Sequence, residues 1–543
     1  MSRPCRFAVL ADLHLSDLDG TAAAAALEWA VTWLGEHPVD FLAVAGDVTT
    51  YGGGPAMAHL LRACAGLACP VYHTPGNAER RGVDAMALLR PHLAPERRRA
   101  VHGTGDGAAQ VLLPDTSTGK VPPAERAWLA AAAADGPGRP VVVTHYPQDK
   151  LAADDAAWLD AWLTDCGAQL LVAGHSHYHR RRSVGAWTEV TVPGLDPDKA
   201  IGGPPGLTLF ERGADGVWTD RFEPWAAELE LLPSDLPGQL NPVGWSVPGD
   251  PAEAVRETRA HGLSCLELRT SGLEWSPAAL EQELAESRRC GPLYLSFHLP
   301  NLTWNAQRQC IDGEDTFRGY VERAVEAKAD HLTVHVPRAL SSQMLDCRGG
   351  YRPEEPSPVY RRMAALMADL LSPAAAAGAR IAMENLHNPA RTPVGAPGQI
   401  FGATIAQMRR WVRTMRDALP RAQVGVHLDV GHARNNGGEL DNRQPLGDWY
   451  ADLGRDVLGY HVHQVRTDPE TGRAVNHRVM ESLWGPRISY AGFLWAWSTR
   501  QLTRGPLFVE VRDADGRRTT ARLLKRLFDG AAAGPATLDQ LPG

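Results

Sequence analysis

A chain of 543 residues is too long for a single hydrophobic core, so its length predicts more than one domain. Hydrophobic residues make up 44% of the chain and charged residues 22%, which is typical of globular proteins. The formal net charge of −8 provides no overall basic surface for nucleic acid, which leaves only a local basic groove as a route to such binding.

Neither a membrane segment nor a targeting segment is expected. No stretch reaches the roughly 20 apolar residues that a membrane-spanning helix needs. The apolar run Phe7–Leu10 leads directly to Asp12 and His14, so it is too short for a signal peptide. The eight cysteines are scattered without a C-x-x-C pair, which is typical of buried thiols in a reducing compartment. We therefore expect a cytoplasmic protein with no membrane partner.

In the first part of the chain, short β-like runs alternate with helix-length stretches, which predicts an α/β domain. Residues 232–242 carry three prolines and a glycine, a composition typical of a linker. We expect one domain at 1–231, this linker, and a second domain at 243–543. The runs of the first domain are Phe7–Leu10, Phe41–Val44, Pro70–His73, Val141–Thr144, Leu170–Val172, Val190–Val192, Leu207–Phe210 and Trp218–Phe222.

Eight further β-like runs follow the linker, and a helix-length segment comes after each of them. Eight β/α units in about 300 residues have the size of a (β/α)8 TIM barrel, and this count favours a barrel over an open doubly wound sheet. The runs are Val243–Val247, Cys265–Arg269, Leu293–His298, Leu332–Val336, Arg380–Glu384, Val424–Leu428, Gly459–His463 and Leu507–Val511.

Five short motifs stand where strands of the first domain are expected to end, which is where α/β folds gather reactive groups. Carboxylate, amide and imidazole ligands of this kind suit divalent ions such as Mn, Fe, Zn, Co or Ni. The set is too large for one tetrahedral ion but sufficient for two ions that share a carboxylate. Glycines before Asp47, Asn77 and His175 allow tight turns that direct these side chains inward. The motifs are Asp12-Leu13-His14, Gly46-Asp47, Gly76-Asn77, His145 and Gly174-His175-Ser176-His177.

The order of these motifs resembles that of the calcineurin-like metallophosphoesterases, over residues 6 to about 195. The resemblance implies an αββα fold, a β-sandwich flanked by helices, with phosphatase or phosphodiesterase activity. It also implies two divalent metals bridged by Asp47, with Asp47, Asn77 and His145 as catalytic residues. One ion would be held by Asp12, His14, Asp47 and His177. The other would be held by Asp47, Asn77, His145 and His175.

One position departs from that family. Many members carry a His after the Gly-Asn pair, where it acts as a general acid near the leaving group, but this chain has Ala78 followed by Glu79. Loss of a positioned acid costs roughly 10²–10⁴-fold in rate for a poor leaving group. The substrate then has a good leaving group, or another residue such as His179 supplies the proton.

The expected strands of the second domain also end in ligand-type residues, at the face where TIM-barrel active sites are built. Asp429-Val430-Gly431-His432 places two of these residues on one turn. Because so many His and Glu side chains follow apolar strands, we expect them to converge. The candidates are His298, His335, Glu384, Asp429, His432, His463, Glu510 and, in the loop after His463, His477, with His387 and His461 as further possibilities.

This part of the chain resembles the xylose-isomerase-like TIM barrels over roughly residues 243–530, through four segments. In the sugar isomerase and epimerase branch, the resemblance implies that Glu384 and Glu510 exchange protons with the substrate. It also implies at least one divalent metal, Mn, Fe or Zn, held by Glu384, Asp429, His463 and Glu510. The matching segments are Met383-Glu384-Asn385, Leu428–His432, Val462-His463 and Val509-Glu510.

Neither branch of that superfamily fits completely. In the endonuclease IV branch a three-metal cluster would use His298, His335, His432 and His477, all of which are present. That branch has an Asp two residues before the loop His, where this chain has Val475. The epimerase branch often has a D-x-x-R pattern, where this chain has Gln464-Val465-Arg466. The four histidines are therefore either metal ligands or substrate-facing residues.

The main hypothesis is a bifunctional enzyme that hydrolyses a small phosphorylated metabolite and isomerises or epimerises a sugar-like compound. The alternative is a nucleic-acid phosphodiesterase, similar to an AP-endonuclease repair enzyme, that uses both domains. The acidic net charge argues against it, because affinity for a phosphate backbone comes largely from Lys and Arg. A third hypothesis is a binding module in which a metal site has become structural.

Overall fold

The computed structural model of the chain describes residues 5–102, 108–136, 139–231, 234–269, 275–346, 355–388, 398–434, 444–530 and 536–541. The chain divides into two compact units, which are considered separately. Unit 1 contains Met1–Glu228, Leu483–Trp495 and Thr537–Gly543. Unit 2 contains Leu229–Ser482 and Ala496–Ala536.

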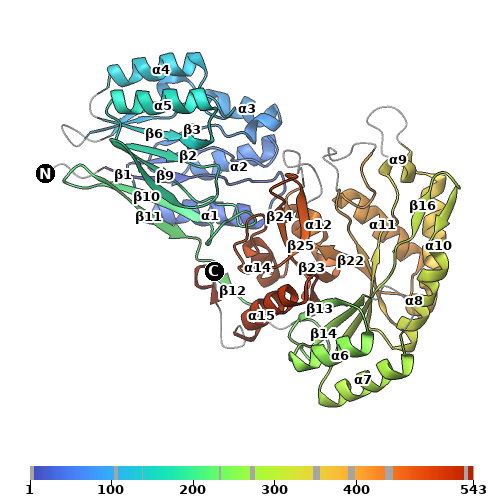
Figure 1. The fold of residues 1–543 in the computed structure, drawn as a ribbon. Helices are drawn as coiled ribbons and strands as arrows, with labels where there is room; N and C mark the ends of the chain where they lie inside the picture. The colour runs from blue at the N-terminus through green and yellow to red at the C-terminus, as the bar shows by residue number, and fades with distance from the viewer. Residues whose placement is uncertain are drawn as a thin grey trace. The chain divides into compact units, whose positions relative to one another are not determined.

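Unit 1 is built on two β-sheets (Figure 1). The first sheet has the strand order β11 (Trp218–Pro224), β10 (Gly206–Arg212), β1 (Arg6–Leu10), β2 (Phe41–Ala45) and β3 (Val71–Thr74). The second sheet has the order β4 (Arg99–His102), β5 (Ala109–Leu112), β6 (Pro140–Thr144), β7 (Leu170–Ala173), β9 (Trp187–Thr191) and β8 (Arg180–Val184).

Alternation along the strands explains why the two sheets pack against each other. Successive side chains of a strand point to opposite faces, so Phe7 and Val9 share one face of β1. Both belong to a buried cluster that also contains Val141 and Val143 of the second sheet. Phe7 lies between Phe41 and Phe210, at ring-centroid distances of 4.6 and 4.9 Å. The main core of unit 1 therefore lies between the sheets.

Helices cover the outer faces of this sandwich. Helices α4 (Pro123–Ala134) and α5 (Ala153–Asp165) bury Leu129, Leu159 and Leu163 in a second apolar cluster with strands of the second sheet. On the other side α1 (Ala22–Glu36) contacts β10, and α2 (Gly54–Cys64) packs beside α1, followed by α3 (Asp84–Leu89). The order helix, sheet, sheet, helix confirms the predicted αββα domain.

Three strands of these two sheets did not stand out in the sequence. β4 and β8 are the edge strands of the second sheet, and each is only partly buried. Residues 180–184, Arg-Arg-Arg-Ser-Val, lack the apolar alternation of a strand with a buried face. β5 is buried, but the polar residue Gln110 interrupts its short apolar run.

Unit 2 is a closed barrel of eight parallel strands, which confirms the predicted TIM barrel. All eight predicted runs form strands of this barrel, with ends shifted by a few residues. The barrel order is β13 (Val243–Pro248), β14 (Cys265–Arg269), β15 (Tyr294–His298), β18 (His331–His335), β21 (Arg380–Glu384), β22 (Val424–Asp429), β23 (Val457–Val462) and β26 (Leu507–Val509).

Several barrel helices begin with a capping residue followed by proline. The side chains of Asp250, Ser276 and Ser357 each accept a hydrogen bond from a backbone N–H in the first helical turn. Proline at the next position has the backbone angle of a helix and needs no hydrogen-bond acceptor there. The helices of unit 2 are α6 (Pro251–Ala260), α7 (Pro277–Cys290), α8 (Glu314–Glu326), α9 (Ser341–Met344), α10 (Pro358–Ala376), α11 (Ile405–Ala418), α12 (Val430–Arg434), α13 (Leu446–Leu453) and α15 (Ala514–Gly530), while α14 (Ala491–Ser498) begins in the segment assigned to unit 1.

The loops of the barrel contain short two-stranded hairpins. The pair β24 (Gln464–Thr467) and β25 (Ala474–Arg478) follows β23 and returns the chain to the end of that strand, with Gln464 opposite Arg478. The loops also carry the pairs β16 (Thr303–Asn305) with β17 (Cys310–Asp312) and β19 (Leu345–Asp346) with β20 (Glu355–Pro356).

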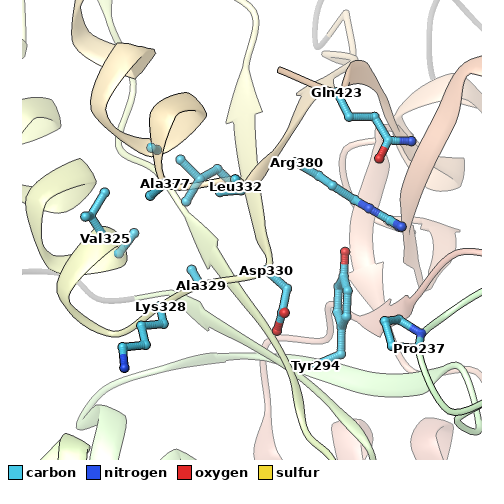
Figure 2. A pocket seen from close by; sticks show the side chains of 14 residues that line it. Pro237, Tyr294, Val325, Lys328, Ala329, Asp330, Leu332, Ala377, Arg380 and Gln423 are labelled. Atoms are coloured by element: carbon cyan, nitrogen blue, oxygen red, sulfur yellow. The ribbon is translucent and has the colours of Figure 1, made fainter. Parts of the chain in front are cut away.

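A cavity of about 330 Å³ lies where several barrel strands begin (Figure 2). Tyr294 and Arg380 are the first residues of β15 and β21, and Asp330 precedes β18. Figure 2 shows the side chains of Tyr294 and Arg380 directed toward each other. TIM-barrel active sites lie at the opposite end, where the strands terminate, so this cavity is not the candidate site.

Part of the predicted second domain lies in unit 1. Segment Leu483–Trp495 packs there through backbone hydrogen bonds from Gly202 N to Trp484 O (3.2 Å) and from Ser489 N to Asp198 O (3.1 Å). The rings of Trp225 and Trp495 are also adjacent. Of the predicted linker, residues 232 and 233 lie outside the described residues, and the rest is part of unit 2. Among the described helices, none combines the length and apolarity required to cross a bilayer.

Candidate metal centres

All seven candidate ligands of unit 1 follow strands at their carboxyl ends. Asp12 and His14 come just after β1, Asp47 after β2, and Asn77 after β3. His145 directly follows β6, and His175 and His177 follow β7. Because β1–β3 belong to one sheet and β6 and β7 to the other, the sandwich brings loops from both sheets together.

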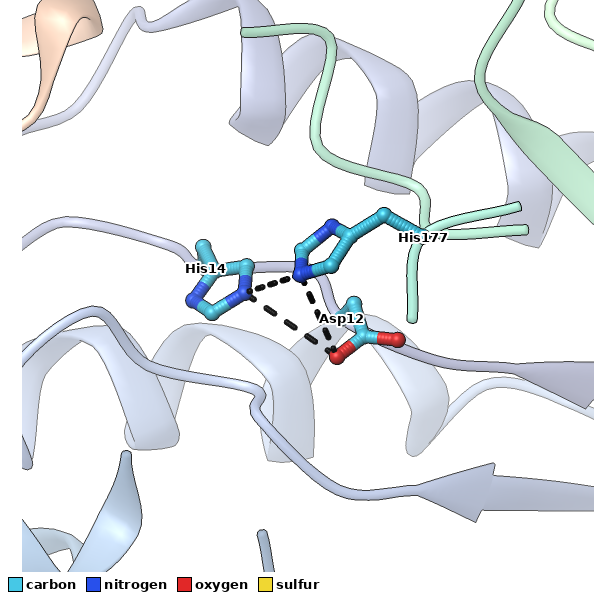
Figure 3. A group of neighbouring side chains, drawn as sticks. All are labelled: Asp12, His14 and His177. Carbon is cyan, nitrogen blue, oxygen red and sulfur yellow. Dashed lines mark hydrogen bonds and ion pairs between the residues drawn. The ribbon is translucent and has the colours of Figure 1, made fainter. Parts of the chain in front are cut away.

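Three of these side chains form one group (Figure 3). The Nε2 atoms of His14 and His177 are 3.4 Å apart, and Asp12 Oδ1 lies 4.0 and 3.7 Å from them. Two ligands bound to one ion at about 2.1 Å are separated by roughly 3.0–3.5 Å, because the coordination angles are 90–109°. The separation of the two nitrogens fits a shared ion.

The other candidates form a second group around His145. Its Nε2 lies 3.4 Å from Asp47 Oδ1, 3.1 Å from Asn77 Oδ1 and 3.2 Å from His175 Nδ1. His145 Nδ1 donates a hydrogen bond to Ala45 O at 3.0 Å, so Nε2 carries a free lone pair. The Asn77 amide can be placed in two orientations. With its nitrogen toward His145 and His175 it would donate to both imidazoles, whereas with Oδ1 toward them it has the orientation of a metal ligand.

Asp47 connects the two groups. Its Oδ1 lies 3.4 Å from His145 Nε2, and its Oδ2 lies 3.8 Å from His14 Nε2. The two carboxylate oxygens thus face one imidazole of each group. This is the geometry that a bridging ligand requires, the role that the sequence resemblance implies for Asp47.

The backbone is strained at most of these positions. A left-handed conformation costs a residue other than glycine of order 1–3 kcal/mol and is retained where surrounding structure imposes it, often at functional sites. Five of the seven candidates have φ between 44° and 69°. They are Asp12, His14, Asp47, His175 and His177.

The electrostatics of unit 1 fit bound cations. Burial, reinforced by the nearby Asp47 carboxylate, raises the pKa of Asp12 well above its ordinary value. Burial lowers the pKa of His145 and of His175 to about 4 each, so both imidazoles are neutral at pH 7 and able to bind a metal. Asp12 Oδ1 is buried without a hydrogen-bond partner among the described residues. A divalent ion would compensate the negative charges of Asp12 and Asp47 and bind to Asp12 Oδ1.

Glu79 has a supporting role that the sequence did not indicate. Its buried carboxylate accepts hydrogen bonds from the backbone nitrogens of Asp47 (3.0 Å), Thr49 (2.9 Å) and Gly76 (2.7 Å). It therefore ties the loop that carries Asp47 to the loop that carries Asn77. In the sequence, only its position two residues after Asn77 pointed to Glu79. Two of the groups that it binds, the backbone nitrogens of Asp47 and Thr49, follow another strand.

In unit 2, Glu384 is the centre of one group. Its Oε2 lies 3.2 Å from His298 Nε2 and 3.0 Å from His335 Nε2, and its Oε1 lies 3.2 Å from His461 Nδ1. Burial opposes ionisation, but His335 and His461 hold the pKa of Glu384 well below its ordinary value. His461, a further candidate in the sequence, thus faces the barrel interior with the predicted ligand.

Asp429 is the centre of the other group. Its Oδ1 lies 3.1 Å from His463 Nε2, and its Oδ2 lies 3.3 Å from His432 Nδ1. Asn385 fixes this turn, because it donates to Asp429 O and accepts from Asp429 N. His432 Nδ1 also lies 3.5 Å from Glu384 Oε1, so the two groups are contiguous.

The fourth predicted barrel ligand, Glu510, reaches the same region. Its Oε2 lies 3.1 Å from His461 Nδ1 and 3.4 Å from His477 Nδ1. His477 lies on the β24–β25 hairpin, has a φ of 59°, and donates its backbone N–H to His463 Nδ1. His387 is adjacent too, with its ring 4.7 Å from that of His432. All predicted barrel candidates are therefore brought together.

A buried polar layer beneath the barrel site was missed. Glu267 Oε1 lies 2.7 Å from His461 Nε2 and accepts a hydrogen bond from Ser246, while Oε2 accepts from Ser296 and Thr333. Burial disfavours a charged imidazole, but Glu267 and Glu384 raise the pKa of His461 to about 10. Glu267 lies in the middle of β14, and nothing in its local sequence separates it from a solvated glutamate.

Comparisons with known proteins identify the families of the two domains. Residues 5–179 match the family model of the calcineurin-like phosphoesterases, and residues 255–528 match that of the xylose isomerase-like TIM barrels. No curated protein sequence matches the chain.

Solved structures resemble each unit at low sequence identity. A dimetal phosphatase from Danio rerio is 14% identical, with a TM-score of 0.32, and the match covers 40% of this chain and 99% of that one. A xylose isomerase domain protein from Planctomyces limnophilus is 14% identical, with a TM-score of 0.38 and coverage of 54% and 99%. Since the barrel match spans half of its length, the chain belongs to the xylose isomerase-like TIM barrel family, and its N-terminal part is a calcineurin-like phosphoesterase domain.

Proposed function

We propose that the N-terminal domain hydrolyses a phosphoester of a small metabolite. The observation that carries this proposal is the pair of ligand groups joined by Asp47. The two ligand groups would hold two divalent ions, which would supply an activated water and compensate the charge of the phosphate. The mixed oxygen and nitrogen donors suit Mn, Fe, Zn, Co or Ni.

Other residues of the domain would bind the phosphate or donate a proton. Burial raises the pKa of Asp47, while the Ala78 N–H and the positive charges of Arg81 and Lys199 act in the opposite direction. The Tyr146 hydroxyl lies 3.2 Å from Asn77 Oδ1 and places a proton donor near the second group, where Ala78 supplies none. His179, the donor suggested by the sequence, has an exposed side chain, and its Nε2 lies 2.8 Å from Asp220 Oδ2.

The test is hydrolysis of nitrophenyl phosphate and bis-nitrophenyl phosphate by the Mn-loaded chain. Asp47→Asn should lower kcat by at least about 100-fold, because it removes a charge that stabilises the transition state. Asp165→Asn, at an exposed end of α5, is the matched control and should retain full activity. If wild type hydrolyses neither ester, or if Asp47→Asn is as active as wild type, the assignment is wrong.

We propose further that the barrel isomerises or epimerises a sugar-like compound. Glu384, Asp429, His463 and Glu510 would hold one divalent ion, which would polarise a substrate carbonyl. Glu384 and Glu510 would move the proton next to that carbonyl. Both carboxylates contact His461 Nδ1, at 3.2 and 3.1 Å, which supports their action on one substrate.

A second candidate chemistry, phosphoester cleavage by several ions, is favoured by one specific observation. Ligand-type atoms of the barrel form separate groups, one containing His298 and Glu384 and another containing His463, His477 and Glu510. More ligand atoms are available than one ion requires. This arrangement keeps open the multinuclear site that the sequence pattern of the histidines suggested.

Metal content decides between these chemistries. The full-length double variant Asp12→Asn and Asp47→Asn should lose the ions of the N-terminal domain and retain those of the barrel. One ion per chain, measured by mass spectrometry of the metal-loaded protein, supports the isomerase. Two or three ions support the cluster, and none contradicts both. Small substrates rather than nucleic acid remain our proposal, because the chain has a net charge of −8.

A further inference from the structure

A second cavity of the barrel opens beside the candidate metal ligands. It has a volume of about 340 Å³ and lies at the carboxyl ends of β13, β14 and β26. Three arginines line it together with two of the candidate ligands. The lining residues used below are Ser246, Arg269, His477, Glu510, Arg512 and Arg517, which we call the arginine pocket.

Arg517 is the most informative residue of this pocket. Its side chain is almost completely buried, and Nη1 donates to the carbonyl oxygens of Val511 (2.9 Å) and Arg512 (3.0 Å). No carboxylate of the described residues forms an ion pair with it. Glu257 and Asp513 favour its charged form from a longer distance, but burial is the larger influence and lowers its pKa. A buried guanidinium without a directly paired carboxylate is costly, and the carbonyls that orient its planar group do not neutralise its charge. An anion in the pocket would do so.

Arg512 presents a second cation at the mouth of the pocket. The residue is exposed, and its backbone N–H donates to His477 O at 3.4 Å. Among the described residues its side chain has no hydrogen-bond or ion-pair partner. A free arginine on a surface is usually only solvated, but this one lines the same cavity as the buried Arg517.

Arg269 connects the pocket to the candidate metal site. At the end of β14, its guanidinium is ion-paired with Glu510, a predicted metal ligand. Three arginines and one carboxylate therefore line the cavity, and that carboxylate is itself proposed to bind a metal. Among the lining residues positive charge is in excess, and arginine forks match the oxygens of a phosphate in charge and geometry.

We propose that the arginine pocket binds the phosphate group of a phosphorylated sugar-like substrate and holds its reacting carbons at the metal site beside Glu510 and His477. This inference rests on the function proposed for the barrel and specifies its substrate class. The shared cavity supports this proposal, because the three arginines and two candidate metal-site residues line it together. The shared chemistry is that of an oxyanion, so a carboxylate is the alternative that the experiment must separate from phosphate.

The test is chemical footprinting of the full-length, metal-loaded protein with phenylglyoxal, which modifies exposed arginines. Mass spectrometry follows Arg512, with the exposed Arg413 of α11 as an internal reference. Inorganic phosphate and ribose 5-phosphate should slow modification of Arg512 at least about fivefold. Ribose, acetate and chloride at matched ionic strength should leave the rate of Arg512 modification unchanged. None of the five additions should change the rate of Arg413 modification.

Variants of α15 test the buried partner. Arg517→Lys keeps the charge but loses the planar fork, so protection of Arg512 should require about tenfold more phosphate. Arg526→Lys, on the same helix with its Nε bonded to Arg522 O, should protect like wild type. Unchanged nitrophenyl phosphate hydrolysis and circular dichroism would show that Arg517→Lys is folded.

The outcomes separate this inference from the proposed function. Equal protection by acetate would reassign the pocket to carboxylates and reject phosphate. No protection, or full protection retained in Arg517→Lys, would reject the pocket. Footprinting measures binding rather than turnover, so protected Arg512 in a barrel without isomerase activity would leave the pocket valid and reject only the proposed reaction.

Discussion

At the scale of single residues, the candidate ligands and their supports account for unfavourable local features. Asp47 has a left-handed backbone, with φ of 48°, and its loop is held by Glu79 through buried hydrogen bonds. Glu79 is itself completely buried, and burial raises its pKa. Such a carboxylate is retained only if its hydrogen bonds offset its desolvation. Glu79 is therefore a positioning residue for Asp47 and Asn77.

Glu79→Gln should weaken metal binding in the N-terminal domain by about 10–100-fold, as is typical for residues that orient metal ligands. The amide cannot accept from three backbone N–H groups without presenting its own N–H to a donor. The measurement is Mn²⁺ titration of nitrophenyl phosphate hydrolysis, with saturating metal restoring much of kcat. Glu96→Gln, on an exposed turn, is the control. Equal Mn²⁺ dependence in wild type and Glu79→Gln would refute this role.

At the scale of elements, strand ends and the first turns after them build both centres. The short helix α12 begins directly after β22, and Gly431 within it lies against the ring of His463. A Cβ at Gly431 would stand 1.9 Å from His463 Cε1, far inside van der Waals contact. The glycine thus permits the close approach of Asp429 and His463.

Gly431→Ala should displace the His463 ring and reduce metal occupancy of the barrel by at least about tenfold, because ligand positions must be accurate to a few tenths of an ångström. Phosphoesterase activity should be unchanged. Gly530→Ala, at the end of α15 where a Cβ would meet no atom within 4 Å, is the matched control. Wild-type metal content in Gly431→Ala, measured by mass spectrometry, would contradict this account of the turn.

At the scale of the whole molecule, the chain carries two centres in two compact units. Unit 1 is not a continuous stretch of sequence, because Leu483–Trp495 returns to it from beyond most of the barrel. This segment contacts the loop around Asp198, which also contains Lys199, one of the cations near Asp47. A chain that ends at residue 231 would lack these contacts, so experiments on either centre should use the full-length protein.

The two activities should nevertheless be separable by substitution. Asp12→Asn should abolish phosphoester hydrolysis and leave the barrel metal in place, because the ligands of each centre come from one unit. Glu384→Gln should have the opposite effect. Metal content and nitrophenyl phosphate hydrolysis of both variants provide the measurement. Loss of both activities from either substitution, with the fold intact by circular dichroism, would indicate a composite site.

The local sequence was sufficient to predict the barrel strands and to name candidate ligands at strand ends in both units. A ligand that directly follows an apolar run can be recognised because parallel strands present their carboxyl ends on one side of the sheet or barrel. This rule located Asp12 and His145 in one unit and Glu384 and Asp429 in the other. It also predicted all eight barrel strands, since each buried strand is a compact apolar run.

Only the tertiary structure decided which distant residues support those ligands. Glu267 and His461 are 194 positions apart, Glu79 joins loops of two different strands, and Arg269 meets Arg512 and Arg517 across the closure of the barrel. Their local sequences resemble those of solvated charged residues, because a side chain's burial and partners depend on which strands become neighbours. Spacing along the chain identifies residues that share an element, whereas contacts between elements arise from packing.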